Sequence, residues 1–244
     1  MIVVDCCDQR NILLLEMLGS GGKNAMSLDE YTVRGYRENI DLALGVGSKL
    51  TQAQIELVGE ESRVFYFVYD ESLDELDCQK VRLLSLPSFV TANSYLTAEG
   101  ALGLIITHTD RALCDMDVGV IGWGYLAKEC AKVIGALSNS LTVMARSNSA
   151  RQEATSQGYM AVDIGDELGE FDVIVNTVPA KIFGQPKLKE GAFVIELASK
   201  IYPFDYEKLG KENVDYLIAK AVPSKLSSKS AARILMETII SYKE

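Results

Sequence analysis

The run Val118–Ala127 constrains the fold of this chain more than any other stretch. An apolar, β-type segment leads directly into Gly122 and Gly124, and a helical pattern follows them. Such a strand, turn and helix begin a dinucleotide-binding unit, in which the second glycine lets the backbone approach a pyrophosphate. The helix N-terminus then offers free N–H groups to the phosphates. We expect Gly122, Gly124, Tyr125 and Leu126 to contact a dinucleotide, although a glycine turn of this kind can also bind nothing.

Length, charge and cysteine content limit the class of protein. The chain has 244 residues, of which 48% are hydrophobic, enough for one large or two small domains. A net charge of −10 argues against nucleic-acid and anionic-membrane binding, because both need an excess of Lys and Arg. We expect no membrane span and no signal peptide, since the apolar runs are short. The scattered cysteines and the single histidine argue against a metal site and favour the cytoplasm.

The first part of the chain alternates strand and helix patterns. Strands are predicted at 2–5, 41–44, 64–69 and 81–86, and helices at 9–18 and 52–58. Thr51 precedes the second of these helices as a predicted N-cap. Strands that alternate with helices form parallel sheets covered on both faces. The stretch 19–37 gives no clear prediction.

A second α/β series follows a long helix predicted at 93–112. Its predicted strands are 118–121, 141–145, 159–162, 173–176, 192–197 and 214–218, and its helices are 125–137 and 150–157. An amphipathic helix at 227–242 ends the chain. We therefore expect an α/β fold of two doubly wound, Rossmann- or flavodoxin-like domains with an interdomain cleft. The predicted domains are 1–92 and a dinucleotide-binding domain at 93–225, and the helix at 226–244 is free to pack back on the first.

The end of the strand after the glycine turn bears on the choice of cofactor. NAD-binding units usually place an acid there, about 20 residues after the glycines, to accept from the ribose 2′-OH. This chain has no acid there, but it has Arg146, Ser147 and Arg151, which are the donors that a 2′-phosphate requires. The pattern favours NADP over NAD and weakens an S-adenosylmethionine interpretation. A solvated arginine at the strand end is the alternative.

Two later turns are expected to line the same cleft. Thr177, Val178 and Pro179 follow one apolar strand, and Leu197 and Ala198 follow the next. In a doubly wound sheet the ligand lies outside the carboxyl ends of the strands, at the point where strand order reverses. Ordinary connecting turns explain these residues equally well.

The long predicted helix carries polar residues at both ends. Asn93, Ser94 and Thr97 lie at its expected start, where they either cap the helix or donate hydrogen bonds into the cleft. His108, near its end, is a candidate proton acceptor. A lone helical histidine also serves as a packing residue or interacts with the helix dipole.

The motifs resemble a known family in order and spacing. Over 93–244 the chain resembles the dipicolinate synthase A-subunit family, through Asn93–Gly100, His108–Asp110, Gly122–Gly124, Ala145–Ser147, Asn176–Pro179 and Glu196–Ser199. The resemblance implies a two-domain fold like that of D-2-hydroxyacid dehydrogenases and S-adenosylhomocysteine hydrolases. It implies NADP-dependent oxidation of dihydrodipicolinate to dipicolinate in sporulating bacteria. It also implies a partner, the flavoprotein-like B subunit, and we expect a homo-oligomer.

Two loops depart from the family pattern. Lys200–Phe204 stands where the family tends to have Pro-Gly-Gly, and Ala221–Lys225 replaces a glycine-rich loop. A dicarboxylate substrate needs cations and hydrogen-bond donors, so we expect it to contact the three residues at the start of the long helix and Ser199, Lys200, Ser224 and Lys225. The changed loops leave two alternatives open. One is a regulatory or non-catalytic nucleotide-binding protein, and the other is a dehydrogenase acting on another small carboxylic acid.

Overall fold

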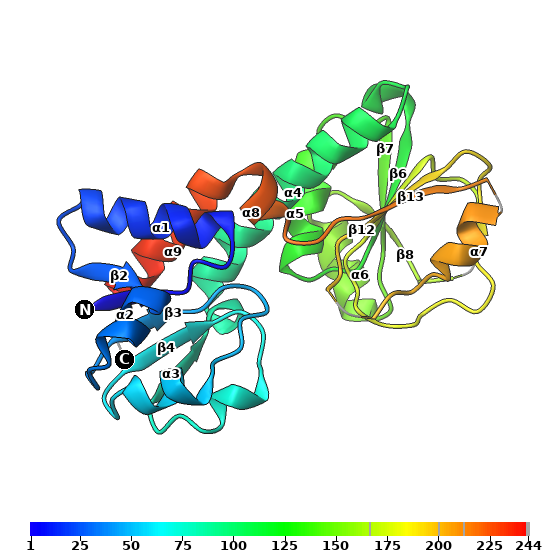
Figure 1. Cartoon of the computed structure of the whole chain (residues 1–244). Helices are drawn as coiled ribbons and strands as arrows, with labels where there is room; N and C mark the ends of the chain where they lie inside the picture. Colours follow the sequence, from blue (N-terminus) through cyan, green and yellow to red (C-terminus); the bar gives the residue numbers. More distant parts are fainter. Residues whose placement is uncertain (166, 200, 212, 243–244) are drawn as a thin grey trace. The chain divides into compact units, whose positions relative to one another are not determined.

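The chain forms two compact units, each built on its own parallel sheet (Figure 1). The computed structural model describes residues 1–165, 167–199, 201–211 and 213–242. The first unit comprises Met1–Asn93 and Pro223–Glu244, and the second comprises Ser94–Val222. The chain passes from the first unit to the second within the long helix α4 (Pro87–His108).

The first unit has a five-stranded sheet in the order β2-β1-β3-β4-β5, with all neighbours parallel. Its strands are β1 (Ile2–Val4), β2 (Ala25–Ser27), β3 (Asp41–Ala43), β4 (Arg63–Tyr66) and β5 (Gln79–Arg82). Its helices are α1 (Gln9–Ser20), α2 (Leu28–Arg34), α3 (Gln52–Leu57), the start of α4, α8 (Val222–Leu226) and α9 (Ser228–Ser241), with short 3-10 turns at Glu71–Leu73 and Leu83–Ser85. The order is that of flavodoxin-like folds.

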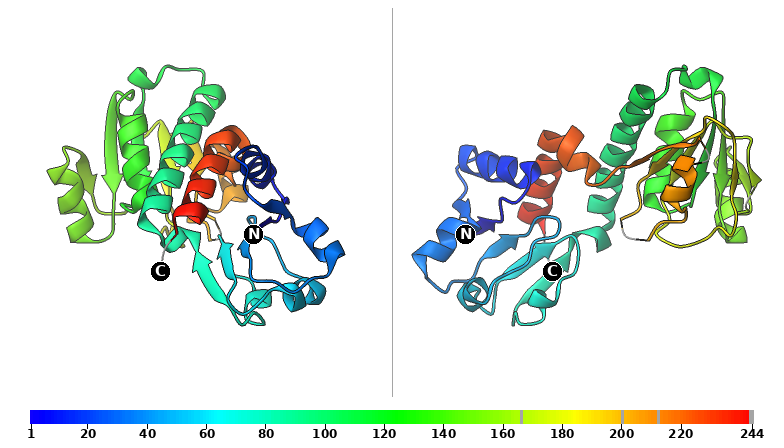
Figure 2. Two further views of the ribbon diagram at one scale, coloured as in Figure 1. Left: turned by 90° about the vertical axis from the view of Figure 1, so that its left-hand side faces the viewer. Right: turned by 45° about the vertical axis from the view of Figure 1, so that its right-hand side comes forward.

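Both faces of the central strands of this sheet are buried, which explains why β1 is apolar throughout. Neighbouring residues of a strand point to opposite faces, so Val3 enters one core and Val4 the other. Helices α2 and α3 contribute to the first core, and α1 and α9 to the second. Helices α1 and α9 lie side by side (Figure 2), so the last helix of the chain completes the first unit.

The second unit has a six-stranded parallel sheet in the order β13-β12-β10-β6-β7-β8. Its strands are β6 (Asp117–Ile121), β7 (Ser140–Met144), β8 (Met160–Val162), β10 (Val173–Asn176), β12 (Phe193–Glu196) and β13 (Asp215–Ile218), beside a short pair, β9 (Glu167–Leu168) and β11 (Lys187–Leu188). The remaining elements are α5 (Tyr125–Gly135), α6 (Asn148–Ser156), α7 (Tyr206–Lys211) and a 3-10 turn at Leu113–Asp115. This is the order of dinucleotide-binding folds, with the reversal between β6 and β10.

Helices α4 and α5 cover one face of the second sheet. Ala98, Ala101 and Ile105 of α4 pack with Ala127 and Ile134 of α5 against the strands. The other face is covered by the segment around Phe171 and Phe204 and by α7. The prediction of two doubly wound α/β sheets is confirmed. Within the described ranges, no helix has both the length and the hydropathy of a membrane span.

Two local predictions are corrected by the structure, and the stretch without a prediction is assigned. The long helix begins at Pro87 rather than at 93, with proline in the first turn, where it loses no hydrogen bond. The strand predicted at 81–86 ends at Arg82 and continues as a 3-10 turn. The unreadable stretch 19–37 contains β2 and α2, and α2 is capped by the Ser27 side chain.

Candidate functional site

The glycine turn lies at the carboxyl end of β6, beside the point where the strand order reverses. Gly122 has a φ of +105°, a backbone conformation that residues with a side chain rarely adopt. A Cβ atom at Gly122 would lie 2.7 Å from Thr177 Oγ1 and 2.8 Å from Val178 Cγ2. Gly122 therefore lets the turns after β6 and β10 pack directly against each other.

Gly124 has a different role, because its lack of a side chain leaves the start of α5 uncovered. It is the N-cap of α5 and supplies no side-chain cap, and a Cβ built on it meets nothing within 4 Å. The first N–H groups of a helix have no acceptor within the helix. Tyr125 is exposed, whereas the Leu126 side chain packs towards the core, so Leu126 can reach a phosphate only through its backbone. This geometry suits the pyrophosphate of a dinucleotide.

The loop after β7 brings together the three donors that the sequence pointed to. The exposed Arg146 has no side-chain hydrogen bond or ion pair with any residue of the described part of the chain. Ser147 caps α6, its Oγ accepting from Ala150 N at 3.2 Å. Arg151 donates to the carbonyls of Ala145 at 2.7 Å and Arg146 at 2.8 Å, and it pairs with Asp163. Arg151 thus fixes the backbone of the loop, and Arg146 is the cation that the loop exposes to solvent.

The turn after β10 is fixed by hydrogen bonds to its neighbours. Thr177 donates to the Ile121 carbonyl through both its backbone N–H, at 3.2 Å, and its hydroxyl, at 2.7 Å. Val178 N–H donates to Asn176 Oδ1 at 3.1 Å. Pro179 is exposed beyond them. The turn therefore has a defined place beside the glycine turn.

Sequence reasoning did not assign a role to Glu196, the last residue of β12, which is fully buried. Its carboxylate accepts from Asn176 Nδ2 at 2.8 and 2.9 Å, from Ala198 N–H at 2.7 Å and from the Tyr206 hydroxyl at 2.7 Å. Burial raises the pKa of Glu196, and these donors partly offset that effect by stabilising the carboxylate. Burial and the nearby carboxylate raise the pKa of Tyr206.

Glu196 therefore connects three segments of the second unit. Asn176 precedes the turn after β10, Ala198 lies in the turn after β12 together with Leu197, and Tyr206 begins α7. A signal was present in the sequence, because an acid ends an otherwise apolar strand. Buried charges need hydrogen-bond partners, and the asparagine that ends the neighbouring strand was the available one.

The structure does not bring His108 to this site. Its ring stacks on Phe193, with centroids 5.7 Å apart, and its Nδ1 lies 2.8 Å from the Leu104 carbonyl. Phe193 is the first residue of β12 and pairs with Val173 of β10. Val173 in turn pairs with Val118, near the start of β6. His108 is thus at the amino edge of the sheet, opposite the glycine turn. The contacts that the structure gives His108 are those of a packing residue at a helix end, and its role as a proton acceptor stays a prediction.

The other predicted substrate residues are divided between the two units. Asn93, Ser94 and Thr97 lie inside α4 rather than at its start, so they are not its caps. Ser199 is exposed after β12, and Lys200 lies outside the described residues. Ser224 is buried in α8, where its hydroxyl lies 3.4 Å from Asp8 Oδ2, and Lys225 beside it is exposed. Within the described part of each unit, these residues do not form one cluster.

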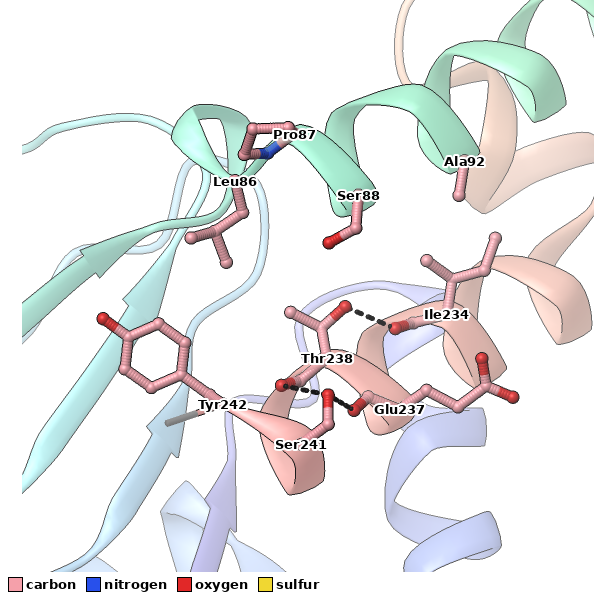
Figure 3. Close-up of a pocket in the computed structure, with 9 residues that line it drawn as sticks. All are labelled: Leu86, Pro87, Ser88, Ala92, Ile234, Glu237, Thr238, Ser241 and Tyr242. Atoms are coloured by element: carbon pink, nitrogen blue, oxygen red, sulfur yellow. Dashed lines mark hydrogen bonds between the residues drawn. The ribbon is translucent and has the colours of Figure 1, made fainter. Parts of the chain in front are cut away.

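A separate hollow in the first unit lies between the start of α4 and α9 (Figure 3). Ser88 and Ala92 face Ile234, Glu237 and Thr238 across it. The Thr238 hydroxyl already donates to a carbonyl of its own helix. The described residues that line the hollow include no cation, so it does not suit the phosphates of a dinucleotide. No cluster of three or more candidate metal ligands occurs in the part of the chain that the structure describes.

The chain is similar to several known dehydrogenase-like proteins, although no family model matches it. The dipicolinate synthase A-subunit of Bacillus subtilis is 27% identical over 165 residues, which are 65% of this chain and 56% of that protein. The match thus spans little more than half of that relative's length. The crystal structure of the dipicolinate synthase A-subunit from Bacillus halodurans superposes with a TM-score of 0.82 and 22% identity, covering 98% of this chain and 96% of that one.

A second solved structure shares the two-domain fold. The NAD complex of a D-isomer-specific 2-hydroxyacid dehydrogenase from Lactobacillus delbrueckii has a TM-score of 0.57 and 12% identity, covering 98% of this chain and 96% of that one. At that identity the likeness concerns the fold. The two parallel sheets of this chain thus have the two-domain architecture of the D-2-hydroxyacid dehydrogenases.

Proposed function

We propose that this chain, a member of the dipicolinate synthase A-subunit family, oxidises dihydrodipicolinate to dipicolinate with NADP. The observation that carries the proposal is the carboxyl edge of the second sheet. Gly122 packs two turns together there, Gly124 leaves the start of α5 open to phosphate, and Arg146 extends from the next loop. The sequence match to the Bacillus subtilis dipicolinate synthase supports the choice of substrate.

The residues present fit a dinucleotide phosphate. Backbone N–H groups of Gly124, Tyr125 and Leu126 would hold the pyrophosphate, and Arg146 with Ser147 would hold the 2′-phosphate. The turns at 177–179 and 197–198 would line the nicotinamide side. When bound, NADP⁺ supplies the hydride acceptor for this oxidation, which releases one proton and leaves an aromatic ring.

The protein's contribution to such a reaction is mainly to position the reactants, because formation of the aromatic ring supplies much of the driving force. Glu196 accepts hydrogen bonds from Asn176, before the turn at 177–179, and from Ala198, in the turn at 197–198. These bonds would keep the backbone of both turns fixed while the ligands bind. Ser199, Lys200, Ser224 and Lys225 remain proposed contacts of the substrate carboxylates.

Partner and location follow from the same proposal. Self-association and a flavoprotein-like B subunit are proposed from the family. The cytoplasm is proposed from the five free cysteines, which suit a reducing compartment.

The test is formation of reduced nicotinamide from freshly prepared dihydrodipicolinate, followed by its absorbance. We expect turnover with NADP⁺ and slower turnover with NAD⁺, with or without a B subunit. Absence of turnover with either cofactor, even with the B subunit present, contradicts the proposal. Product analysis separates this reaction from oxidation of another small carboxylic acid.

The two altered loops favour one other function, a regulatory protein that binds the nucleotide without turning over a substrate. Lys200–Phe204 and Ala221–Lys225 replace glycine-rich segments of the family, and Ala221 has a φ of +55°. Tight NADPH binding without turnover across hydroxy, keto and imino acids would favour this second function.

A further inference from the structure

Another hollow lies entirely within the second unit, between the loops that follow β10 and β12 and the helix α7 (orange in Figure 1). Its volume is about 360 Å³, near the lower end of the roughly 300–1,000 Å³ that ligand pockets occupy. That volume suits a molecule of one or two rings rather than a dinucleotide. The side chains that matter for its chemistry are Lys181, Phe183, Tyr202, Phe204, Asp205 and Lys208.

Aromatic rings form one wall of this hollow, and contacts deeper in the unit fix them in place. Phe183 stacks on Phe204, with ring centroids 4.9 Å apart and planes inclined by 30°. Phe204 and Tyr202 each pack against Tyr206, with centroids 6.0 and 5.8 Å apart. The Tyr206 hydroxyl donates to the buried Glu196 carboxylate at 2.7 Å. A further planar ring packs favourably on such a wall in an offset or edge-on arrangement.

The groups that would recognise a ligand are open to solvent. Phe183 and Tyr202 are half-buried, so part of each side chain remains exposed beside the hollow, whereas Phe204 is almost fully buried. Lys181 and Lys208 are exposed and line the same hollow. A ligand can therefore reach both the rings and the cations without any rearrangement of the core.

Lys181 differs from the other lysines of its segment in having no acidic partner. Two lysines that follow it are paired, Lys187 with Glu167 at 2.5 Å and Lys189 with Asp172 at 2.6 Å. Lys181 forms no ion pair or side-chain hydrogen bond with any residue in the described ranges. Its charge is therefore available to an anion that enters the hollow.

The acid beside the hollow already has a structural role. Asp205 Oδ1 accepts from the Lys208 N–H at 3.2 Å, in the first turn of α7. Among the described lining residues the charged groups are thus two ammonium groups and one engaged carboxylate, in a chain whose net charge is −10. A lysine ammonium is a point charge with rotatable donors, so it can meet a carboxylate from several directions. The hollow therefore combines aromatic surface with positive charge.

We propose that this hollow is a binding site for a small, planar aromatic carboxylate, separate from the proposed cofactor and substrate contacts. The ring of the ligand packs against Phe183 and Tyr202, and its carboxylate meets Lys181 or Lys208. None of the described lining residues is a proposed contact of NADP or of dihydrodipicolinate. Identification of the ligand with dipicolinate, which belongs to this class, rests on the proposed function, whereas the presence of the site does not.

The test is calorimetric titration of the full chain with isophthalate, a planar aromatic dicarboxylate that lacks the ring nitrogen with which dipicolinate chelates metals. Wild type should bind it saturably. Lys181→Glu should weaken binding by about tenfold, because one exposed attraction is lost and one repulsion is gained. Lys211→Glu is the matched control with the same net charge, since Lys211 is an exposed lysine of α7 that does not line the hollow. At physiological ionic strength it should bind isophthalate as wild type does.

A second probe tests the aromatic wall. Hexahydroisophthalate carries the same two carboxylates on a saturated ring that is not planar, and it should bind roughly 2–12-fold more weakly than isophthalate, the range for an aromatic pair. Equal affinity for the two probes overturns the ligand class. A Lys181→Glu variant that melts and binds isophthalate as wild type does overturns the site, and so does a wild type that binds neither isophthalate nor dipicolinate.

NADPH formation from dihydrodipicolinate distinguishes this site from the proposed reaction. Lys181→Glu should form NADPH at the wild-type rate, because Lys181 is not a proposed contact of either reactant. Lys181-dependent binding of isophthalate without NADPH formation by wild type supports the site and contradicts the reaction. Loss of NADPH formation together with isophthalate binding in Lys181→Glu overturns the separation of the hollow from the substrate contacts.

Discussion

Replacing Glu196 by glutamine tests whether one buried carboxylate organises the turns of the second unit. The change preserves the size of the side chain and removes its charge. In wild type, Oε1 accepts from Asn176 and Ala198, and Oε2 accepts from Asn176 and Tyr206. A glutamine offers one accepting oxygen, and in either orientation its NH₂ group faces the Asn176 amide, which is itself a donor. The second group that it faces is the Ala198 N–H or the Tyr206 hydroxyl.

The expected cost follows from these contacts. At least one buried donor loses its acceptor, and the remaining bonds lose their charge assistance, for about 1–3 kcal/mol. Part of this loss is offset because burying the charge itself is unfavourable, as the raised pKa of Glu196 indicates. We expect the melting temperature to fall by about 2–4 °C for each kcal/mol lost in a chain of this size. Because both turns shift, NADPH should bind about tenfold more weakly.

Thermal melting and NADPH titration measure the two effects. Glu170→Gln is the control, since Glu170 is an exposed acid of the same unit, and surface changes of this kind are usually within about 0.5 kcal/mol of wild type. A Glu196→Gln variant that melts and binds NADPH like Glu170→Gln would show that the carboxylate does not organise the turns.

Three further perturbations test other parts of the structure. Gly122→Ala should abolish NADPH binding in titrations, because its Cβ would lie 2.7 Å from Thr177 Oγ1 at a φ of +105°. Gly103→Ala, in the middle of α4, is the control and should leave binding intact, because a Cβ there meets nothing within 4 Å. Asp172→Asn should lower the melting temperature at pH 7 and much less near pH 2. Burial raises the pKa of Asp172, but hydrogen bonds from Lys189, Asp117 N–H and Arg111 outweigh that effect and lower it from 3.8 to about 2, so its contribution is present above pH 3.8 and is lost as the pH falls towards 2. Equal losses at both pH values would contradict this. Thr51→Ala should destabilise the protein by about 0.5–2 kcal/mol, because Thr51 and Gln54 form a capping box, and denaturant unfolding measures it.

Strands that are buried on both faces were predictable from composition alone. The runs at 118–121 and 173–176 became β6 and β10 because uninterrupted apolar residues suit a strand covered by helices. The stretch 19–37 was not predictable, because β2 is a three-residue edge strand and α2 is held by a distant contact. In that contact the Tyr31 hydroxyl donates to the Leu57 carbonyl at 2.8 Å. The start of α4 was missed because Asn93 and Ser94 are typical N-cap residues, whereas both lie inside the helix.

For the candidate site, the local sequence pattern identified the glycine turn but not the contacts of the polar side chains. Gly122 and Gly124 could be found because their role depends on local conformation. The edge of the sheet that His108 reaches depends on where α4 ends relative to β12, which no local pattern records. The hydrogen bonds of Glu196 depend likewise on the neighbouring strand.

The most direct test of the dinucleotide site is a comparison of NADPH and NADH affinities for wild type and Arg146→Gln, by nicotinamide fluorescence or calorimetry. Wild type should bind NADPH more tightly than NADH. Loss of the charge-assisted contact to the 2′-phosphate should weaken NADPH binding in Arg146→Gln by roughly 10–150-fold and leave NADH nearly unchanged. Binding of neither nucleotide by wild type, or equal weakening of both by Arg146→Gln, would contradict an NADP site at Gly122–Leu126.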